Sequence, residues 1–452
     1  MALITTFASS PLTVYFYPLW YQKKVEAWKR GEIDWDTGKP IDGSESVASV
    51  HYEKLESEKI RRLTIYLRLD SMPNLLAFSS LFGGQHALPT PKLHPSAQQA
   101  AVASNDTSEE KPKRPVEAYG LRLLNLTDRG SSVMQVSELE SYTAHDPVVN
   151  TFRTFGRLHN LAVSGEVLVV PESSFADTLS TRASNSDLLL LPWSETGGMS
   201  EQAIIEDKGT KNKLAAPSYL SFVNATLDQA TVTTAVLINK NFGGPKNKDK
   251  TELNRLARTY SHASLSSTRD KAIVAPIADR SHHIFFPFFG GQDDRAALRV
   301  VLQLAENPEI TATLVHFEVP DEFLQATSSS SHIKGGDVAT TLSDTRSQDA
   351  SFFASLRASI PSDISSRVLF ETVSSSNPLK DILARAGAEV GRTPKNAGDL
   401  VVLGRKSLHL PDVSDEIKSS SSTANTLGVL TEKVWESKLG ASVLVVKAAV
   451  HG

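Results

Sequence analysis

The first residues that could bind a ligand lie between an apolar run and a helix pattern. Gly290 and Gly291 precede Asp293 and Asp294 in the segment FFPFFGGQDDRAALRVV. Glycine lets a backbone approach a ligand closely, and a helix N-terminus attracts anions. Carboxylates in the first helical turn are also ordinary capping residues, and they would repel a phosphate. The pattern therefore favours a helix start over an anion site.

A second candidate follows the apolar run DLVVLG, where Gly404, Arg405, Lys406 and Ser407 form the segment GRKS. The carboxyl end of a parallel strand is the usual ligand crevice of an α/β sheet, so these residues could contact a phosphate. A basic loop is more often a solvated surface, and we favour that interpretation. The matching segment earlier in the chain, LPWSETGG, has Glu195 and no positive charge. Only the later segment could therefore bind a nucleotide.

A histidine pair, His282 and His283, precedes the apolar run IFFPFF. Histidine titrates in the physiological range, but neighbours in an extended segment point to opposite sides and make a poor metal site. We expect a structural or solvent-exposed role for both. The chain has no Walker loop, no G-x-S-x-G elbow, no His-Glu-x-x-His and no complete G-x-G-x-x-G. We therefore predict no catalytic residue, no metal site and no enzymatic activity.

Composition narrows the classes of protein that the chain could represent. It has 452 residues, of which 40% are hydrophobic and 22% charged, so it can build real cores, and two or three domains are expected. A net charge of -4 argues against a dedicated nucleic-acid binder. The lack of cysteine excludes disulfides, thiolate metal sites and a thiol nucleophile.

Strand and helix patterns alternate along the chain and then repeat. Fully apolar runs such as DLLLLP are typical of buried parallel strands, so we predict a mostly parallel sheet with helices on its faces. In the first copy, strands are expected at 63–69, 118–126, 166–170, 187–192 and 231–239, and helices at 74–82, 150–160, 175–184 and 219–229. In the second copy, strands are expected at 284–289, 311–319, 367–373, 399–404 and 442–448, and helices at 295–306 and 378–387. Two copies of one α/β unit explain the length of the chain.

The same patterns set the predicted boundaries. Serine-rich segments at 326–349 and 413–426 are expected to be exposed flexible loops within the second copy. The whole chain is divided into the end of a transmembrane helix at 1–20, a juxtamembrane linker at 21–57, a first α/β domain at 58–245, a linker at 246–281 and a second α/β domain at 282–450.

The first twenty residues are uncharged and mostly apolar, but they are barely long enough to span a bilayer. We interpret them as the last part of a span. An N-terminal arm packed on the domain is the alternative that composition leaves open. Aromatic and basic residues follow, as expected where a helix leaves a membrane on its cytoplasmic side. The membrane-proximal set is Trp20, Tyr21, Lys23, Lys24, Trp28, Lys29 and Arg30.

Several segments resemble one transporter family. These are YPLWYQKKVEAWKRGEIDWD, HHIFFPFFGGQDDRAAL, GDLVVLGRKS and TLGVLTEKVWESKLGASVLVV. They are similar to the cytosolic tails of fungal K(+)/H(+) antiporters of the monovalent cation:proton antiporter 2 family and of plant cation/H(+) exchangers. The resemblance covers nearly the whole chain and is weakest at 84–113 and 326–349. It implies two tandem universal-stress-protein-like, Rossmann-like domains, with the transport helices before Met1.

What the resemblance implies for function is a cytosolic C-terminal regulatory domain of a potassium, or sodium, proton antiporter in potassium and pH homeostasis. The implied location is the cytoplasmic side of an endomembrane, Golgi or endosome, or of the plasma membrane. The expected partners are the transmembrane domain of the same polypeptide, a second copy in a homodimer and an anionic membrane surface near the N-terminus, with no nucleic acid. The alternative is a soluble tandem universal-stress-protein module that binds an adenine nucleotide.

Universal stress proteins that bind adenine nucleotides carry the signature G-x2-G-x9-G-[ST], and this chain departs from it. Ser407 stands where the second glycine belongs after Gly404, and Gly428 is followed by Val429. Each departure removes a phosphate contact. The resemblance thus implies no resident cofactor, and it leaves an AMP-like ligand open at Gly404, Arg405, Lys406, Ser407 and Gly428.

Overall fold

The fold is given by a computed structural model. It describes residues 59–83, 115–125, 145–201, 214, 216–240, 242–243, 279–318, 336–393, 396–406, 421–437 and 439–449. Two compact units divide the chain. Residues 351–360 belong to one unit, and all the strands belong to the other, which comprises Lys59–Ala350 and Pro361–Gly452. The predicted transmembrane end at 1–20, the membrane-proximal residues, the linker at 21–57 and residues 246–278 of the linker predicted at 246–281 lie outside the described residues.

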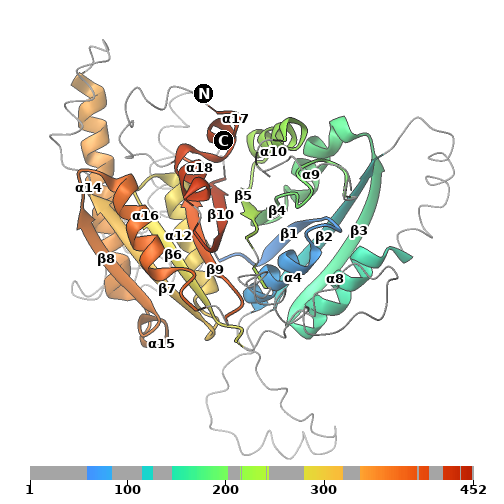
Figure 1. Ribbon diagram of the computed structural model, residues 1–452, viewed down its shortest axis with the longest axis horizontal. Helices are drawn as coiled ribbons and strands as arrows, with labels where there is room; N and C mark the ends of the chain where they lie inside the picture. The colour runs from blue at the N-terminus through green and yellow to red at the C-terminus, as the bar shows by residue number, and fades with distance from the viewer. Residues whose placement is uncertain are drawn as a thin grey trace, which may run out of the picture. The chain divides into compact units, whose positions relative to one another are not determined.

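One ten-stranded sheet runs through the larger unit, in the order β3-β2-β1-β4-β5-β10-β9-β6-β7-β8 (Figure 1). Strands of the first half are β1 (Arg62–Leu67), β2 (Val116–Asn125), β3 (Leu161–Val170), β4 (Leu188–Pro192) and β5 (Thr233–Ile238). Strands of the second half are β6 (His282–Phe288), β7 (Ile310–Glu318), β8 (Val368–Ser374), β9 (Asp399–Gly404) and β10 (Ala441–Lys447).

The two halves meet at an antiparallel pair of strands. Neighbouring strands within each half are parallel, whereas β5 and β10 run in opposite directions, with Val445 opposite Val236. Each half repeats the same strand order outward from that pair, so the chain contains two copies of one unit. The predicted mostly parallel α/β architecture is confirmed. The fusion of the two copies into a single sheet is a feature that the sequence patterns did not predict.

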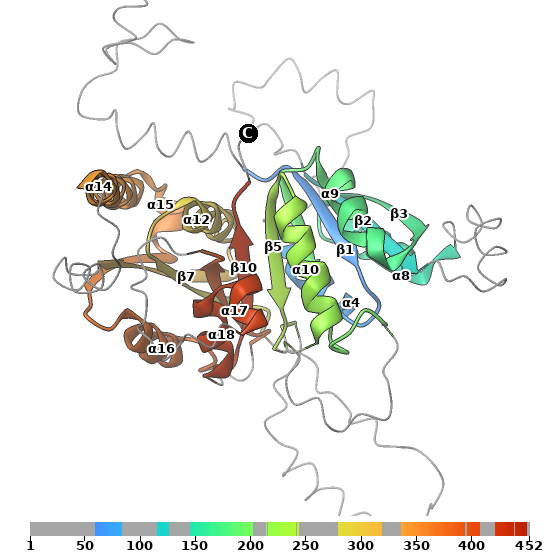
Figure 2. The ribbon, with the colours of Figure 1, turned by 90° about the horizontal axis from the view of Figure 1, so that it is seen from above.

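Helices connect the strands on both sides of the sheet, and Figure 2 shows α12 and α16 on opposite sides. Helices of the first half are α4 (Met72–Ser80), α8 (Pro147–Leu158), α9 (Phe175–Ala183) and α10 (Pro217–Gln229), with short 3₁₀ turns η1 (Leu81–Gly83) and η2 (Glu172–Ser174). Helices of the second half are α12 (Gln292–Leu304), α14 (Gly336–Ser359), α15 (Ser362–Ser365), α16 (Pro378–Glu389), α17 (Ser422–Leu427) and α18 (Val429–Glu436). Proline starts α8, α10 and α16, where its missing N–H breaks no helical hydrogen bond.

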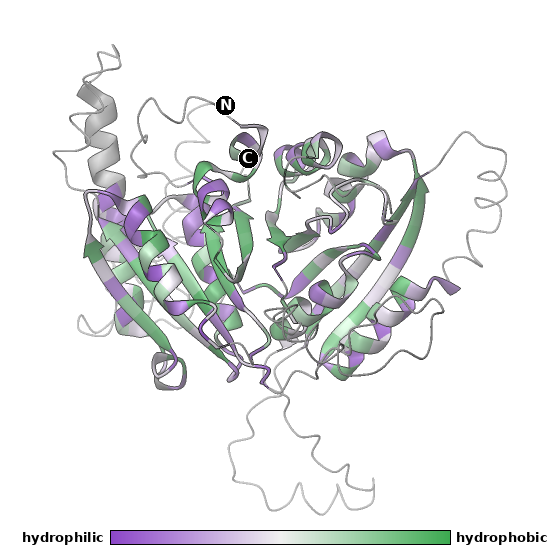
Figure 3. Ribbon diagram, viewed as in Figure 1, coloured by the Kyte–Doolittle hydropathy of each residue, from purple (hydrophilic) through white to green (hydrophobic). Residues whose placement is uncertain are grey.

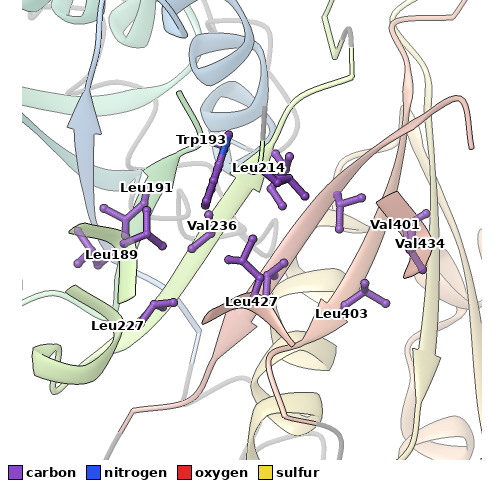
Figure 4. Close-up of a cluster of buried hydrophobic side chains, with 14 of the residues drawn as sticks. Leu189, Leu191, Trp193, Leu214, Leu227, Val236, Val401, Leu403, Leu427 and Val434 are labelled. Atoms are coloured by element: carbon purple, nitrogen blue, oxygen red, sulfur yellow. The ribbon is translucent and has the colours of Figure 1, made fainter. Parts of the chain in front are cut away.

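A single hydrophobic core covers one face of the sheet in both halves. Alternate residues of the strands point into it, and helices α9, α10, α16, α17 and α18 close it. Figure 4 shows Leu189 and Val236 of the first half in the same cluster as Val401 and Leu403 of the second. Hydrophobic residues dominate the strands, while the helices mix both kinds (Figure 3). Burial of this apolar surface is therefore continuous across the junction of the halves.

Two predicted loops contain helix. Helix α14 covers the second part of the 326–349 segment, and α17 covers the end of the 413–426 segment. Serine is only mildly unfavourable inside a helix, and alanine, leucine and arginine between the serines support α14. Serine is also a strong N-cap residue: the side chain of Ser421 accepts a hydrogen bond from Ala424 N at 3.1 Å. The serine-rich composition therefore gave the wrong prediction for these residues.

Candidate functional site

The strand order of each half reverses between its first and fourth strands. These are β1 and β4 in the first half and β6 and β9 in the second. In an open α/β sheet, ligands bind beyond the carboxyl ends of the strands at such a switch point. The two switch points are therefore the candidate sites of the chain.

A buried ion pair fills the first switch point. Arg68 follows β1 and has no exposed surface, and its Nε lies 2.9 Å from Asp70 Oδ1. The same guanidinium donates to Ser194 Oγ at 3.1 Å and to the backbone oxygens of Gly198 and Met199 at 3.1 and 3.2 Å. Chain segments after β1 and after β4 are thereby joined by one arginine.

Asp70 also joins the segments after β1 and β4, because it accepts hydrogen bonds from the loop that follows β4. Glu195 N donates to Asp70 Oδ2 at 3.0 Å, and Ser194 Oγ donates to the same oxygen at 3.2 Å. A buried ion pair offsets its desolvation only when further hydrogen bonds satisfy its atoms, and here they do. A phosphate entering this site would have to displace Asp70 from Arg68.

Two buried tyrosines flank the guanidinium. The ring of Tyr219 lies 4.9 Å from the carbon of the Arg68 guanidinium, and its hydroxyl donates to Pro192 O at 2.5 Å. Burial raises the pKa of Tyr219 well above its ordinary value and raises the pKa of Tyr66 to about 12. Both hydroxyls therefore stay neutral at physiological pH, and Asp70 provides the compensating charge. The sequence patterns did not identify Arg68, because a charged residue at a strand end is more often exposed.

Three carboxylates gather at the second switch point. Asp293 and Asp294 lie in the first turn of α12, as predicted, and Asp349 comes from α14. Asp293 accepts from Lys406 N at 3.0 Å and from Ala448 N at 2.7 Å, so it holds the ends of β9 and β10. Asp349 accepts from Gly291 N at 3.1 Å and from Arg295 Nε at 2.6 Å. The charges of Asp293 and Asp349 would repel a phosphate at the start of α12.

The glycine pair before α12 has a conformational role. Gly290 and Gly291 have φ angles of 97° and 96°, a region that L side chains rarely adopt. This turn lets Phe289 N donate to Asp294 Oδ2 at 2.8 Å. Among the described residues, no group of three or more His, Asp or Glu side chains is placed to hold a metal ion.

Arg405, which we expected on a solvated loop and considered as a phosphate contact, is buried and joins the two halves. It is 8% exposed, and its guanidinium donates to Thr426 O at 2.8 Å and to Asp228 and Asn224 of α10 at 3.1 Å each. A phosphate would therefore compete with three existing partners. The Lys406 side chain is exposed, and its backbone N–H is bound to Asp293.

The two signature glycines pack against other parts of the chain. A Cβ on Gly404 would overlap Asp294 Oδ1, and a Cβ on Gly428 would overlap Arg405 O. Gly428 also has a φ angle of 93°, where it separates α17 from α18. Both glycines are required by close packing whether or not a ligand binds. Ser407 lies outside the described residues, so the proposed nucleotide turn stays a prediction.

A reciprocal pair of lysines lies at the junction of the halves. Lys240, after β5, donates to Trp435 O at 3.0 Å and to Leu439 O at 3.4 Å, and its ammonium lies 4.2 Å from the Trp435 ring. Lys447, at the end of β10, donates to the oxygens of Leu227 and Ala230. Each lysine thus binds carbonyls at or just beyond the end of the last helix of the opposite half, α18 or α10. Sequence reasoning missed them, although each follows the last strand of its repeat.

The histidine pair occupies two environments, as predicted from its extended backbone. His282 is 5% exposed, contacts Gly398 O through Nδ1 at 2.7 Å and stacks on Phe242 at 4.5 Å. His283 is partly exposed, and its Nε2 lies 3.2 Å from Glu389 Oε2. Burial lowers the pKa of His282.

Part of the chain is similar in sequence to two plant proteins. The chain is 22% identical over 227 residues to Cation/H(+) antiporter 17 of Arabidopsis thaliana and 24% identical over 218 residues to Cation/H(+) antiporter 3 of the same plant. The aligned regions cover 47% and 46% of this chain. They cover 23% of each plant protein, so the chain spans about a quarter of the length of these relatives.

Two further comparisons concern domain families and structures. No protein-family model matches the chain. The crystal structure of a universal stress protein from Archaeoglobus fulgidus DSM 4304 matches over 85% of this chain and 96% of its own, with 14% sequence identity and a TM-score of 0.37. Within the part of the chain that the structure describes, no helix is both long enough and apolar enough to cross a bilayer.

Proposed function

We propose that this chain is the cytosolic regulatory region of a cation/proton antiporter, and that the antiporter exchanges potassium, or sodium, for protons. In this proposal the chain follows a transport domain of the same polypeptide and works in a homodimer at an endomembrane or at the plasma membrane. The organism group is proposed to be fungal, from the resemblance described above. Its task is to change the rate of exchange in potassium and pH homeostasis.

The observation that carries the proposal is the similarity to two plant cation/proton antiporters over almost half of this chain. The geometry of the switch points gives separate support. Arg68 and Asp70 fill one, and three carboxylates surround the other. A chain that fills one switch point with its own ion pair and places carboxylates at the other is better suited to respond through its conformation than to turn over a substrate.

Transport measurements with and without this region test the proposal. The complete reading frame, expressed in cells that lack their own exchangers, should show potassium/proton exchange with a defined pH dependence. Removal of residues 59–452 should change that dependence or the maximal rate while protein remains at the membrane. Unchanged flux, localisation and abundance would contradict a regulatory role. A reading frame without apolar spans before Met1 would contradict the proposed partner.

The rival function, a soluble module that binds an adenine nucleotide, makes a different prediction. It requires ATP or AMP to bind the 452-residue chain, and it requires Arg405→Ala with Lys406→Ala to abolish that binding. Calorimetry on both proteins separates the two proposals. Because Arg405 is already bound to α10, the regulatory proposal predicts no heat of binding for either nucleotide.

A further inference from the structure

One carboxyl of the second switch point is sealed inside the protein. Asp294 has no exposed surface, and its Oδ2 accepts from Phe289 N at 2.8 Å. Its other oxygen, Oδ1, is buried and has no hydrogen-bond partner among the described residues. That oxygen faces the backbone of Gly404, where even a Cβ would overlap it. An ionised carboxylate in this position would have an unsatisfied charge, because Oδ1 is shielded from solvent and no donor among the described residues reaches it.

Among the described residues of the neighbouring elements, no charged group neutralises Asp294. On its own helix it has Asp293 and Arg295, and Arg295 is bound to Asp349 of α14. Burial raises the pKa of Asp294 well above its ordinary value, and the charges of Asp293 and Asp349 add to the rise. The backbone N–H groups of Phe289 and Gly290 oppose it. Cations on the β9 and β10 side are Arg405, Lys406 and Lys447, and the first and last of these bind groups of the first half.

The backbone that packs on Asp294 continues directly into the junction of the halves. Gly404 is followed by Arg405, whose guanidinium binds Asp228 and Asn224 of α10. The next residue, Lys406, is held by Asp293 through its backbone N–H. Movement of the 404–406 segment away from α12 would therefore pull the Arg405 side chain off the first half.

We propose that Asp294 is a proton-linked latch between the two halves. Its neutral carboxyl packs on Gly404 and keeps Arg405 seated on α10. Loss of the proton places a charge against the β9 backbone, and the 404–406 segment separates from α12 so that water reaches the carboxylate. Arg405 then leaves Asn224 and Asp228. This latch is a property of the chain itself, and only its use as a signal to an exchanger rests on the proposed function.

The direction of the pH effect follows from proton linkage. In the unfolded chain, Asp294 ionises near the ordinary aspartate pKa of about 3.9. The folded protein keeps the proton to higher pH, so between the two pKa values it binds one more proton than the unfolded chain. The stabilisation that the neutral Asp294 carboxyl provides is fully present below the unfolded pKa and is lost as the pH rises toward the folded pKa. The folding equilibrium constant decreases about tenfold per pH unit until the folded pKa is passed.

Denaturant unfolding of the 452-residue chain tests the linkage. Asp294→Asn has the shape of the neutral carboxyl and cannot ionise. Between pH 5 and 9, the ratio of wild-type to variant folding constants should fall about tenfold per pH unit at first and then level off. Asp177→Asn is the matched control, because Asp177 lies exposed in the first turn of α9, outside the latch, and the ratio for this variant should be flat with pH. A ratio for Asp294→Asn that is flat with pH would overturn the proposal.

Two measurements on the wild-type chain remain informative if the variant does not fold. Infrared absorption of a protonated carboxyl should persist at neutral pH and disappear as the pH is raised. Hydrogen exchange, corrected for its intrinsic pH dependence, should then accelerate in residues 399–406 and 217–229 together. Absence of a protonated carboxyl at neutral pH, or exchange that accelerates in neither segment, would overturn the latch. Neither result depends on transport, so failure of the latch and failure of the proposed function are distinguishable.

Discussion

At the scale of single residues, two buried aspartates after equivalent strands have opposite surroundings. Asp70 is paired with Arg68 and accepts backbone N–H groups, whereas no cation among the described residues forms an ion pair with Asp294 and one of its oxygens has no described partner. The sequence shows both as an aspartate near the start of a helix. Arg68 is only two residues from Asp70, but the other groups that make the surroundings different, such as Ser194 and Asp349, are more than fifty residues away. Residue type alone therefore predicted the position of these side chains and not their charge state.

The buried pair in the first half predicts a large cost for Arg68→Ala. This change leaves Asp70 buried without its cation, and we expect a loss of about 3–5 kcal/mol in the free energy of unfolding. Urea denaturation measures it. Arg62→Ala is the control, because the Arg62 side chain is 55% exposed and lies 3.7 Å from Asp187. That control should change stability by no more than about 0.5 kcal/mol. Equal effects of the two changes would contradict the account of the buried pair.

His282 predicts a loss of stability in mild acid. Burial lowers its pKa in the folded protein, so the unfolded chain binds the proton first. Neutral His282 therefore favours the folded state fully above about pH 6.5. As the pH falls toward the folded pKa, this stabilisation is lost, and the free energy of unfolding decreases by up to about 1.4 kcal/mol per pH unit. His282→Phe keeps a ring against Phe242 and cannot be protonated, so its stability should fall less between pH 6.5 and 5 in urea titrations. Parallel curves for the two proteins, with His283→Gln as control, would refute this role.

At the scale of elements, a lysine at or just after the end of the last strand of each half binds the end of the last helix of the other half. Lys240 binds carbonyls at the end of α18, and Lys447 binds carbonyls at the end of α10. Cations stabilise helix C-termini because the carbonyls there have no helical partners. The antiparallel pair of β5 and β10 makes both contacts possible at once. The junction is thus held by helix ends as well as by apolar packing.

Removal of either lysine should weaken this junction. Lys240→Ala and Lys447→Ala are each expected to lower the free energy of unfolding by about 1–2 kcal/mol, since both ammonium groups are partly buried at helix ends. Lys433→Ala is a suitable control, because Lys433 forms an exposed pair with Glu436 within α18. Chemical denaturation of the 452-residue chain provides the measurement. Effects of the two junction variants that do not exceed the control would show that the caps are unimportant.

At the scale of the whole molecule, local sequence patterns predicted the two α/β units but not that the units share one sheet. Apolar runs such as Leu188–Pro192 and Asp399–Gly404 predicted strands because buried parallel strands need continuous hydrophobic residues. Repetition of those runs predicted two α/β units. The pairing of β5 with β10 was not predictable, because edge strands of separate sheets and central strands of one sheet have the same apolar composition. The burial of Arg405 was also not predictable from local patterns, because its partners on α10 precede it by about 180 residues.

We propose that the tandem α/β chain regulates cation/proton exchange through the junction of its halves. Potassium/proton exchange should be measured against cytosolic pH for the complete protein and for the Lys240→Ala, Lys447→Ala double variant. Lys433→Ala serves as the control, and membrane abundance is measured in parallel. We predict that the double variant shifts the pH dependence of exchange at unchanged abundance, while the control matches the wild type. Superimposable flux curves for all three proteins, with the junction shown to be weakened by denaturation, would contradict the account.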